Sequence, residues 1–329
     1  MKTIKLLFGT VLIASIILVA CKKEEPEIIV LPPIDNLTPT SNIGGFFDNN
    51  LESEKQTFTI NPSSDYMVTG VNGTTLFFNA NTFEDMNGNT VSGPVEIEMI
   101  ETQSNKDMLL WNRPTTTTDG QLLVSGGIVY INVSQEGNQI SINDNSPIQA
   151  SIPSDNFIAM DFFVGGEDND GRFGWELDIA DTVITNTDTT TNWNPNGGGM
   201  FTFDFEIDSI GWINCDYFYG TGDPLTGVQV ELTDSFDGSN SAVFIYYSNL
   251  NSVASLYDSD EDGVFDLGWS YATPVGQNIS FIVISEINGS FYYAILNATI
   301  VNGHYEIISS SDMMGPVTST DIQNAINIL

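Results

Sequence analysis

The residues best suited to chemistry form a run of carboxylates in the last quarter of the chain. The segment reads Asp258-Ser259-Asp260-Glu261-Asp262-Gly263-Val264-Phe265-Asp266. Carboxylates at its first, third and fifth positions can surround one side of a hard cation, and the glycine at its sixth position allows a sharp turn. Asp266, at the ninth position, can complete the shell directly or through water. The spacing therefore predicts Asp258, Asp260, Asp262 and Asp266 as candidate calcium ligands.

This segment resembles the calcium loops of EF-hands and thrombospondin type-3 repeats, with one departure. Its twelfth position is Trp269, so the acid that would hold calcium with both oxygens is absent. The flanking residues 253–257 and 267–271 have strand composition, so a solvated acidic hairpin tip remains the alternative. A second acidic segment at 167–171 offers half as many ligands, which makes Asp168 and Asp170 weaker metal candidates.

The sequence offers little for nucleophilic catalysis. The chain has a single histidine, so the thiol–imidazole pair to consider for catalysis is Cys215 with His304. Cys215 stands among aromatic and aliphatic residues, where a small buried thiol is the usual outcome. No Gly-rich phosphate loop, His-Glu-x-x-His or Cys-x-x-Cys pattern occurs. We therefore predict no catalytic residues, although 43 acidic residues leave carboxylate pairs for glycoside hydrolysis open.

Cys21 points to covalent lipid chemistry. A short start containing Lys2 and Lys5 precedes an apolar run of 14 residues, 6–19. A membrane-spanning helix needs about 20 such residues, so the run is typical of a removable secretory signal. Leu18-Val19-Ala20-Cys21 resembles the lipobox of bacterial lipoproteins. The resemblance implies cleavage before Cys21 and diacylation of its thiol; an ordinary signal with a chance cysteine is the alternative.

The residues after Cys21 bear on the compartment. Lys22-Lys23-Glu24-Glu25 has no aspartate directly after the cysteine and resembles the surface-export signal of Bacteroidota lipoproteins. That resemblance implies a lipid-anchored protein of the outer membrane facing outward, with a periplasm-facing orientation as the alternative. Residues 21–54, rich in proline and glycine and without periodicity, are expected to form a lipidated tether.

Charge excludes one class of partner. The formal net charge is −35, and residues 173–329 contain no Lys or Arg. A surface of this kind repels phosphates, so we expect no binding to nucleic acid. The apolar content of 41% still permits substantial cores. With Cys21 lipidated, Cys215 has no cysteine with which to form an intramolecular disulfide.

Short alternating runs bounded by Gly, Asn, Asp or Pro predict an all-β fold. In the segment 95–99, Val, Ile and Met alternate with two Glu, as in a half-buried antiparallel strand. We expect two β-sandwich-like domains in tandem, at 55–180 and 201–329, after a signal peptide at 1–20. The Thr-, Asn- and Gly-rich stretch 181–200 is predicted to be the linker. A short C-terminal helix is expected after a cap at Ser319 or Thr320.

A family resemblance supports the first domain. Gly73-Thr74-Thr75-Leu76-Phe77-Phe78 and Ser125-Gly126-Gly127-Ile128-Val129-Tyr130 are similar to segments of uncharacterised Bacteroidota surface lipoproteins. Over residues 55–155 this similarity extends to the β-sandwich domain shared by netrin receptors and ankyrins. The resemblance implies no catalytic residues.

Three functions remain open at this point. The first is a lipid-anchored cell-surface protein with a non-enzymatic interaction or structural role. The second is a calcium-dependent glycan-binding or adhesin-type module that uses the acidic loop and the many aromatic residues of the second half. The third is a surface glycosidase. The expected partners are the membrane, through Cys21, and a surface glycan or protein.

Overall fold

The computed structural model describes residues 43–154, 157–169, 171–188, 200–220, 222–258, 262–268 and 273–329, and the structural statements below concern these residues. Most of them lie in β-strands, and a short helix ends the chain, so the all-β class is confirmed. The expected signal peptide, Cys21 and the tether as far as residue 42 lie outside the described residues. Within those residues, no helix has both the length and the apolar character needed to cross a membrane.

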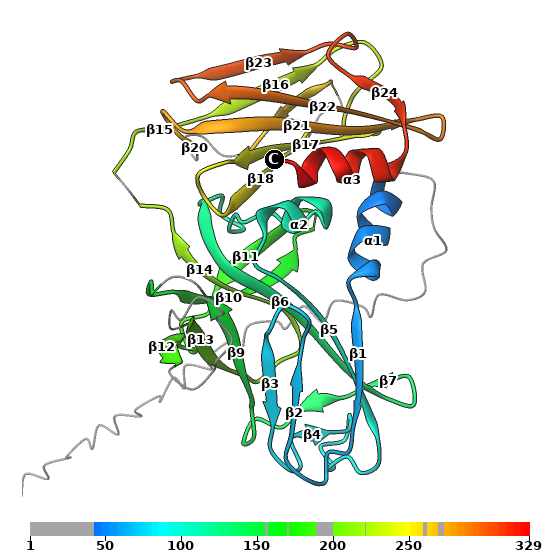
Figure 1. Ribbon diagram of the computed structural model, residues 1–329, viewed down its shortest axis with the longest axis vertical. Coiled ribbons are helices and arrows are strands. Elements are labelled where there is room, and N and C mark those ends of the chain that lie inside the picture. Colours follow the sequence, from blue (N-terminus) through cyan, green and yellow to red (C-terminus); the bar gives the residue numbers. More distant parts are fainter. Residues whose placement is uncertain are drawn as a thin grey trace, which may run out of the picture.

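The first unit, in the lower half of Figure 1, is a sandwich of two antiparallel sheets. One sheet has the strand order β1 (Gln56–Ile60), β5 (Val95–Thr102), β6 (Leu123–Gln135), β14 (Gly211–Phe218), β10 (Asp161–Glu167) and β11 (Phe173–Leu177), with β7 (Asn138–Gln139) beside β6. The other has the order β12 (Ile184–Asp188), β13 (Met200–Ile207), β9 (Ile148–Ser154), β3 (Thr75–Phe78) and β2 (Tyr66–Thr69). A short pair, β4 (Phe83–Glu84) and β8 (Ser141–Ile142), accompanies them.

The alternation expected in β5 is confirmed. Val95, Ile97 and Met99 are buried in the core between the two sheets, while Glu96 is exposed and Glu98 half-buried. The same core receives side chains from the facing sheet, so β5 supplies the apolar face that a sandwich requires.

The second unit is a smaller sandwich above the first. Its larger sheet has the order β18 (Ser252–Leu256), β17 (Ser241–Tyr247), β21 (Asn278–Ile287), β22 (Ser290–Thr299) and β24 (Met314–Val317). The smaller sheet has the order β19 (Val264–Asp266), β16 (Val228–Leu232) and β23 (His304–Ile308), and a pair formed by β15 (Leu225–Thr226) and β20 (Thr273–Pro274) lies beside them. Val230 and Phe265 pack from the smaller sheet against Ile245 and Phe281 of the larger one.

The strand pairing moves the expected boundary between the two units. β13 and β14, predicted to open the second domain at 201, pair with β9, β6 and β10 of the first unit. The first unit therefore continues to Phe218, and the stretch 181–200 contains β12 and the first residue of its neighbour β13, two paired strands of one sheet. A loop-like composition is the same for a hairpin connection and for an interdomain linker, which is why the sequence misplaced the boundary. Residues 189–199 of that stretch lie outside the described residues.

Three helices fill the space between the units in Figure 1: α1 (Ile43–Ser53), α2 (Asn105–Leu110) and α3 (Ser319–Asn327). α1 lies inside the stretch 21–54 that was expected to form a tether, so residues 43–53 of that stretch are helical instead. α3 begins after Thr318, one residue before the predicted cap, and Thr318 forms a capping box with Asp321. Ile322 and Ile326 of α3 are fully buried.

These helices create a third core that both units share. It contains Phe46 and Phe47 of α1, Met108 and Leu109 of α2, Ile322 and Ile326 of α3, Trp175 and Trp212 of the first unit, and Phe244 and Ile282 of the second. The Phe47 and Phe244 rings lie 5.8 Å apart, so α1 contacts the second unit directly. Large apolar interfaces hold domains in one relative position, so we treat the two units as one body.

Hydrogen bonds reinforce this interface at the edge strand β18. The Thr115 N–H donates to the Val253 carbonyl at 2.7 Å, and the Val253 N–H donates to the Thr115 hydroxyl at 2.9 Å. Asn251, in the turn before β18, donates from its side chain to the Ser125 carbonyl at 2.7 Å and accepts from the Asn105 N–H at 3.1 Å. The first unit therefore pairs with part of the edge that β18 would otherwise leave open.

Candidate functional site

Asp258, the first predicted calcium ligand, is an acceptor for three backbone N–H groups. Its Oδ2 accepts from Gly238 at 2.9 Å and from Gly263 at 2.8 Å, and its Oδ1 accepts from Asp262 at 3.1 Å. Gly263 has a φ of +85°, which glycine adopts without strain. The carboxylate thus closes its own loop and joins it to the segment before β17.

The other acids of this loop also bind backbone groups. Asp262 accepts from the Val264 N–H at 3.0 Å, and Asp266 accepts from the Gly268 N–H at 2.6 Å. Asp260 lies outside the described residues, as does Asp170 of the weaker motif. Among the residues that are described, no three His, Cys, Asp or Glu side chains are grouped as a metal site. Calcium binding by Asp258, Asp260, Asp262 and Asp266 stays a prediction.

Asp168 shapes the hairpin between β10 and β11. Its backbone N–H donates to the Arg172 carbonyl, and its Oδ1 accepts from the Arg172 N–H, both at 2.9 Å. This turn places Arg172 at the interface between the units. Its guanidinium lies over the Tyr257 ring of the second unit, 4.8 Å from the ring centroid. A cation over an aromatic face at this distance is attractive, so the pair links the two acidic segments across the interface.

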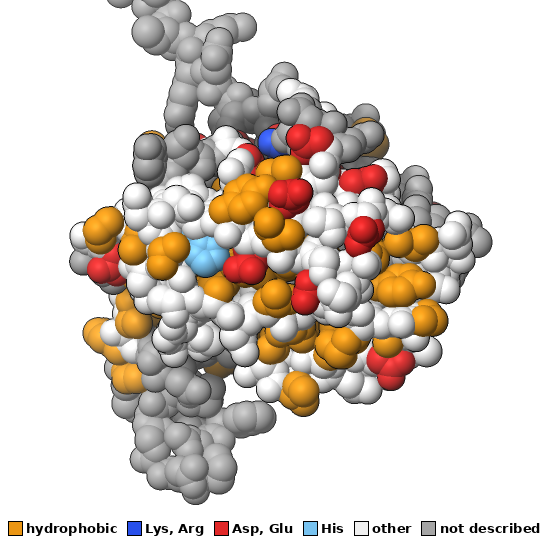
Figure 2. All heavy atoms as spheres, turned by 90° about the horizontal axis from the view of Figure 1, so that it is seen from above, with side chains coloured by type: hydrophobic (Ala, Val, Ile, Leu, Met, Phe, Trp, Pro, Cys, Tyr) orange, Lys and Arg blue, Asp and Glu red, His pale blue; other side chains and the backbone are white. Residues whose placement is uncertain are grey.

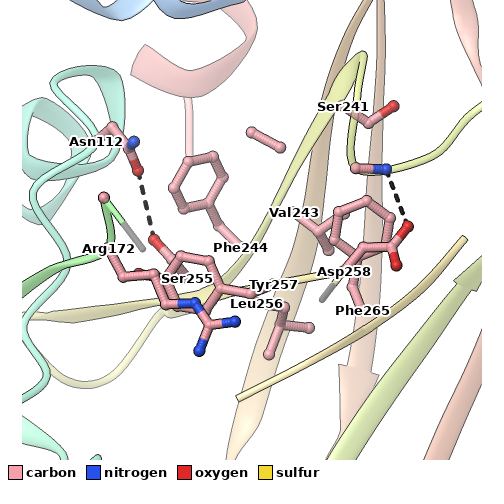
Figure 3. A pocket seen from close by; sticks show the side chains of 13 residues that line it. Asn112, Arg172, Ser241, Val243, Phe244, Ser255, Leu256, Tyr257, Asp258 and Phe265 are labelled. Atoms are coloured by element: carbon pink, nitrogen blue, oxygen red, sulfur yellow. Dashed lines mark hydrogen bonds between the residues drawn. The ribbon is translucent and has the colours of Figure 1, made fainter. Parts of the chain in front are cut away.

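The Arg172–Tyr257 pair lines a cleft of about 480 Å³ between the units. Figure 3 shows the pair on one side of the cleft, with Asp258 and Ser241 on the other. Asn112, just beyond α2, lines it from the first unit, and Ser255 donates to its side-chain oxygen at 3.5 Å. A small second pocket shares Arg172, Ser255 and Tyr257 and extends the cleft toward Asp168 and the hydroxyls of Thr117 and Thr118.

The ionisable side chains of this cleft are better suited to binding a ligand than to reacting with one. Burial raises the pKa of Tyr257 to about 12, against the opposing effects of hydrogen bonding with Ser255 and of the Arg172 charge. The phenol therefore stays neutral at physiological pH. Asp258 accepts hydrogen bonds from backbone donors, and the Arg172 guanidinium lies over the Tyr257 ring. The cleft offers hydrogen-bond donors and acceptors beside an aromatic face.

Arg172 and Asn112 were not predicted from the sequence as site residues. Arg172 carried one usable signal, since it is the last basic residue of the chain and directly follows an acidic segment. Asn112 carried none, because its role depends on a φ of +52° at the end of α2 and on the second unit beside it.

The Cys215–His304 pair is not brought together. Cys215 lies on β14 in the core of the first unit, whereas His304 lies on β23 in the small sheet of the second. Burial raises the pKa of the Cys215 thiol well above its usual value, which disfavours the thiolate. His304 accepts a hydrogen bond from the Val301 N–H at its Nδ1, and its ring lies beside Phe281.

Acidic side chains do gather in a second hollow, on the sheet formed by β12, β13, β9, β3 and β2. This pocket of about 640 Å³ is lined by Asp181, Asp204 and Glu206, among others. Burial raises the pKa of Asp181 to about 6, with further contributions from Asp208, Asp178 and Glu206. Asp204 accepts hydrogen bonds from Ser151 and Asn186, each at 2.6 Å.

The outer face of the second unit, at the top of Figure 1, is seen face-on in Figure 2. Figure 2 shows apolar side chains on this face separated by acidic ones. Tyr305 and Ile307 of β23 are about half exposed, and the Tyr305 hydroxyl donates to Glu231 on the neighbouring strand. Tyr246 and Tyr247 of β17, by contrast, are both buried, since one faces the shared core and the other the core of the second unit.

No protein-family model and no curated protein matches the chain. The cleft between the units is therefore interpreted from its own geometry.

Proposed function

We propose that this chain is a lipid-anchored protein of the bacterial outer membrane, attached through Cys21 and displayed at the cell surface, with a non-enzymatic binding role. The binding site is the cleft between the two β units. The observation that carries this proposal is the shared core, because it fixes the two walls of the cleft relative to each other. A preformed site loses little entropy when it binds.

The position of α1 agrees with this role. Its first residue, Ile43, lies within the stretch 21–54 that was expected to form the tether, and its phenylalanines enter the shared core. A pull on the anchor would thus act on the junction of the two units rather than on either sandwich alone. This arrangement suits a body that must keep one shape while tethered.

The non-enzymatic assignment rests on the groups that line the cleft. A general acid or base works best with a pKa near the operating pH. The Tyr257 phenol does not have such a pKa, and the Asp258 carboxylate is engaged by three backbone donors. The cleft residues therefore suit recognition better than proton transfer.

A surface glycosidase is the second candidate, and one observation favours it. Asp181 combines a pKa of about 6 with the neighbouring carboxylate of Glu206 in the hollow on the first unit. A carboxyl group with a raised pKa beside a second carboxyl group is the pairing that glycoside hydrolysis uses. If Asp181→Asn and Glu206→Gln each abolish hydrolysis of a chromogenic glycoside by the wild-type chain, this candidate replaces the binding role.

The proposed function is tested by localisation in the producing bacterium. We expect the wild-type chain in the outer-membrane fraction and expect protease added to intact cells to degrade it. Cys21→Ser should release the chain from that fraction or leave it unprocessed, whereas Cys215→Ser should leave its location unchanged. Full protection of the wild-type chain from external protease would place it on the periplasmic side and contradict surface display.

A further inference from the structure

We infer that α1 is a load-limiting strap: a pull on the N-terminal anchor detaches α1 from the second unit and lengthens the chain before either sandwich opens. The inference rests on the proposed attachment through Cys21, because that attachment directs a pull to this end of the chain. Three features of α1 lead to it: the contacts that hold α1, its low stability as an isolated helix, and the direction in which it is loaded.

α1 is joined to one unit by the chain and packs against the other by its side chains. Only residues 54–55 separate it from β1 of the first unit. Its aromatic rings contact the larger sheet of the second unit. The Phe46 ring lies 5.6 Å from the Phe291 ring on β22, and the Phe47 ring makes the contact with Phe244 on β17 described above. α1 therefore bridges the two units as a strap, continuous with one and resting on the other.

α1 has little stability of its own. It contains 11 residues, and isolated helices shorter than about 12–15 residues are marginal in water. Its sequence, IGGFFDNNLES, includes two glycines and three Asp or Asn residues, all of them weaker helix formers than Ala. α1 therefore stays helical because Phe46, Phe47 and Leu51 are buried in the shared core, and it uncoils once these contacts are lost.

The direction of the pull favours release of α1 over opening of the first sheet. α1 and β1 follow one another along nearly the same line in Figure 1, so tension that enters at Ile43 runs along both. The hydrogen bonds of a helix lie along its axis, so tension breaks them one turn after another. The bonds between β1 and β5 lie across the strands, so tension along β1 loads all of them together. α1 is thus the weaker of the two elements under this load.

A pair of ion contacts marks the point where release stops. The Lys55 ammonium lies 2.8 Å from the Glu52 carboxylate of α1 and 3.3 Å from the Glu98 carboxylate of β5. Directly after Lys55, the five residues of β1 pair with β5. Unwinding beyond Ser53 must therefore break the contact between Lys55 and Glu98 and then the β1–β5 ladder.

The junction of the units keeps other contacts when α1 is detached. Thr115 and Val253 still exchange two hydrogen bonds, the Asn251 side chain still donates to the Ser125 carbonyl, and Ile322 of α3 belongs to the same core. The 11 released residues gain about 20 Å, the difference between their extended and helical lengths. A helix re-forms within about a microsecond when the load falls. α1 therefore absorbs brief pulls on the anchor while the two sandwiches keep their shape.

Magnetic tweezers test the strap on the full mature chain, residues 21–329, made without lipid. One DNA handle is attached to the Cys21 thiol, at the site of the proposed anchor. The other is attached through Val301→Cys, at an exposed position between β22 and β23 of the second unit, and Cys215 takes no handle because it is buried. We expect a first, reversible gain of about 20 Å in contour length, at a force below that which opens either sandwich.

Two variants and a control assign this first step to α1, each measured at the force that releases half of the wild-type chains. Phe47→Ala removes a buried ring and should raise the ratio of released to docked chains at least about tenfold. Asn49→Ala, at an exposed position of α1, introduces the best helix former and should lower that ratio about threefold. Phe157→Ala removes an exposed ring of the first unit and should leave the ratio unchanged. Asn49→Ala keeps every buried contact of α1, so it serves if Phe47→Ala does not fold.

The inference is overturned if the chain first lengthens by the extent of a whole sandwich, or if neither Phe47→Ala nor Asn49→Ala changes the force of the first step. Neither result would bear on attachment through Cys21 or on surface display, which fractionation and protease treatment of cells test separately. Failure of the inference is thus separable from failure of the proposed function.

Discussion

Asp216 provides a quantitative test of the packing in the first unit. Its side chain is fully buried on β14, where Oδ2 accepts a hydrogen bond from the Asn214 amide at 2.6 Å. Burial raises the pKa of Asp216 to about 8, although the hydrogen bond from Asn214 acts in the opposite direction. An ordinary aspartate in an unfolded chain has a pKa near 3.9, so the folded protein loses this proton at a pH about four units higher than the unfolded chain does.

The sign and size of the effect follow from that difference. Below about pH 4 both states are protonated and Asp216 costs no stability. As the pH rises toward 8, the unfolded chain loses its proton first, and unfolding becomes easier. Above pH 8 the folded carboxyl is also ionised and the full cost is present. At 1.36 kcal/mol per pKa unit, that cost is about 5 kcal/mol.

We therefore expect Asp216→Asn, which cannot ionise, to gain stability over the wild type as the pH rises from 4 to 9. Urea unfolding at pH 5, 7 and 9, followed by tryptophan fluorescence, measures the difference. The difference in unfolding free energy should move in favour of Asp216→Asn by several kcal/mol across that range. Asp161→Asn, which removes an exposed carboxylate from the residue paired with Asp216, controls for the loss of one negative charge. A difference that does not change with pH would mean that Asp216 is already ionised in the folded protein.

Three further predictions test separate parts of the account. Glu101 is 4% exposed and accepts from the Asn72 N–H at 2.8 Å and the Thr74 N–H at 2.9 Å, so Glu101→Gln should lower the free energy of urea unfolding by roughly 1–3 kcal/mol. An unchanged unfolding midpoint would show that the β2–β3 turn does not depend on the Glu101 carboxylate. Ile322→Ala should lower the unfolding free energy by roughly 2–5 kcal/mol because Ile322 is fully buried in the shared core, whereas Ile328→Ala, at an 85% exposed position, should change it little. Equal effects of the two variants would refute the packing of α3 against that core. The calcium hypothesis predicts that millimolar calcium raises the melting temperature of the full chain more than sodium chloride of equal ionic strength, and that the double variant Asp260→Ala, Asp262→Ala removes this difference. Identical melting curves in calcium and in sodium chloride would mean that the segment 258–266 is only an acidic turn.

The sequence was informative where local rules decide the structure. Alternation predicted β5 correctly, and Thr318 with Asp321 follows the capping preference one residue before the predicted cap. Prediction from the sequence failed where a β-strand is covered on both faces. Strand alternation alone would place one of the adjacent rings of Tyr246 and Tyr247 in solvent, yet the helices between the units bury that face as well.

The candidate site was predictable only in part. The two acidic segments were recognised, and the structure places Asp168 and Asp258 at the same interface. What joins them is Arg172 stacked on Tyr257, a contact between residues 85 positions apart that depends on the pairing of the two units. No local pattern encodes such a contact, because it arises from tertiary packing. The same reason explains why the sequence did not place β14 in the first sheet.

Attachment through Cys21 is tested most directly by mass spectrometry of the N-terminal peptide from chain purified out of the outer membrane. The account predicts a peptide that begins at Cys21 and carries a diacylglyceryl group on the thiol, with residues 1–20 removed. A peptide that begins elsewhere, or an unmodified Cys21 thiol in the membrane-bound chain, would contradict it.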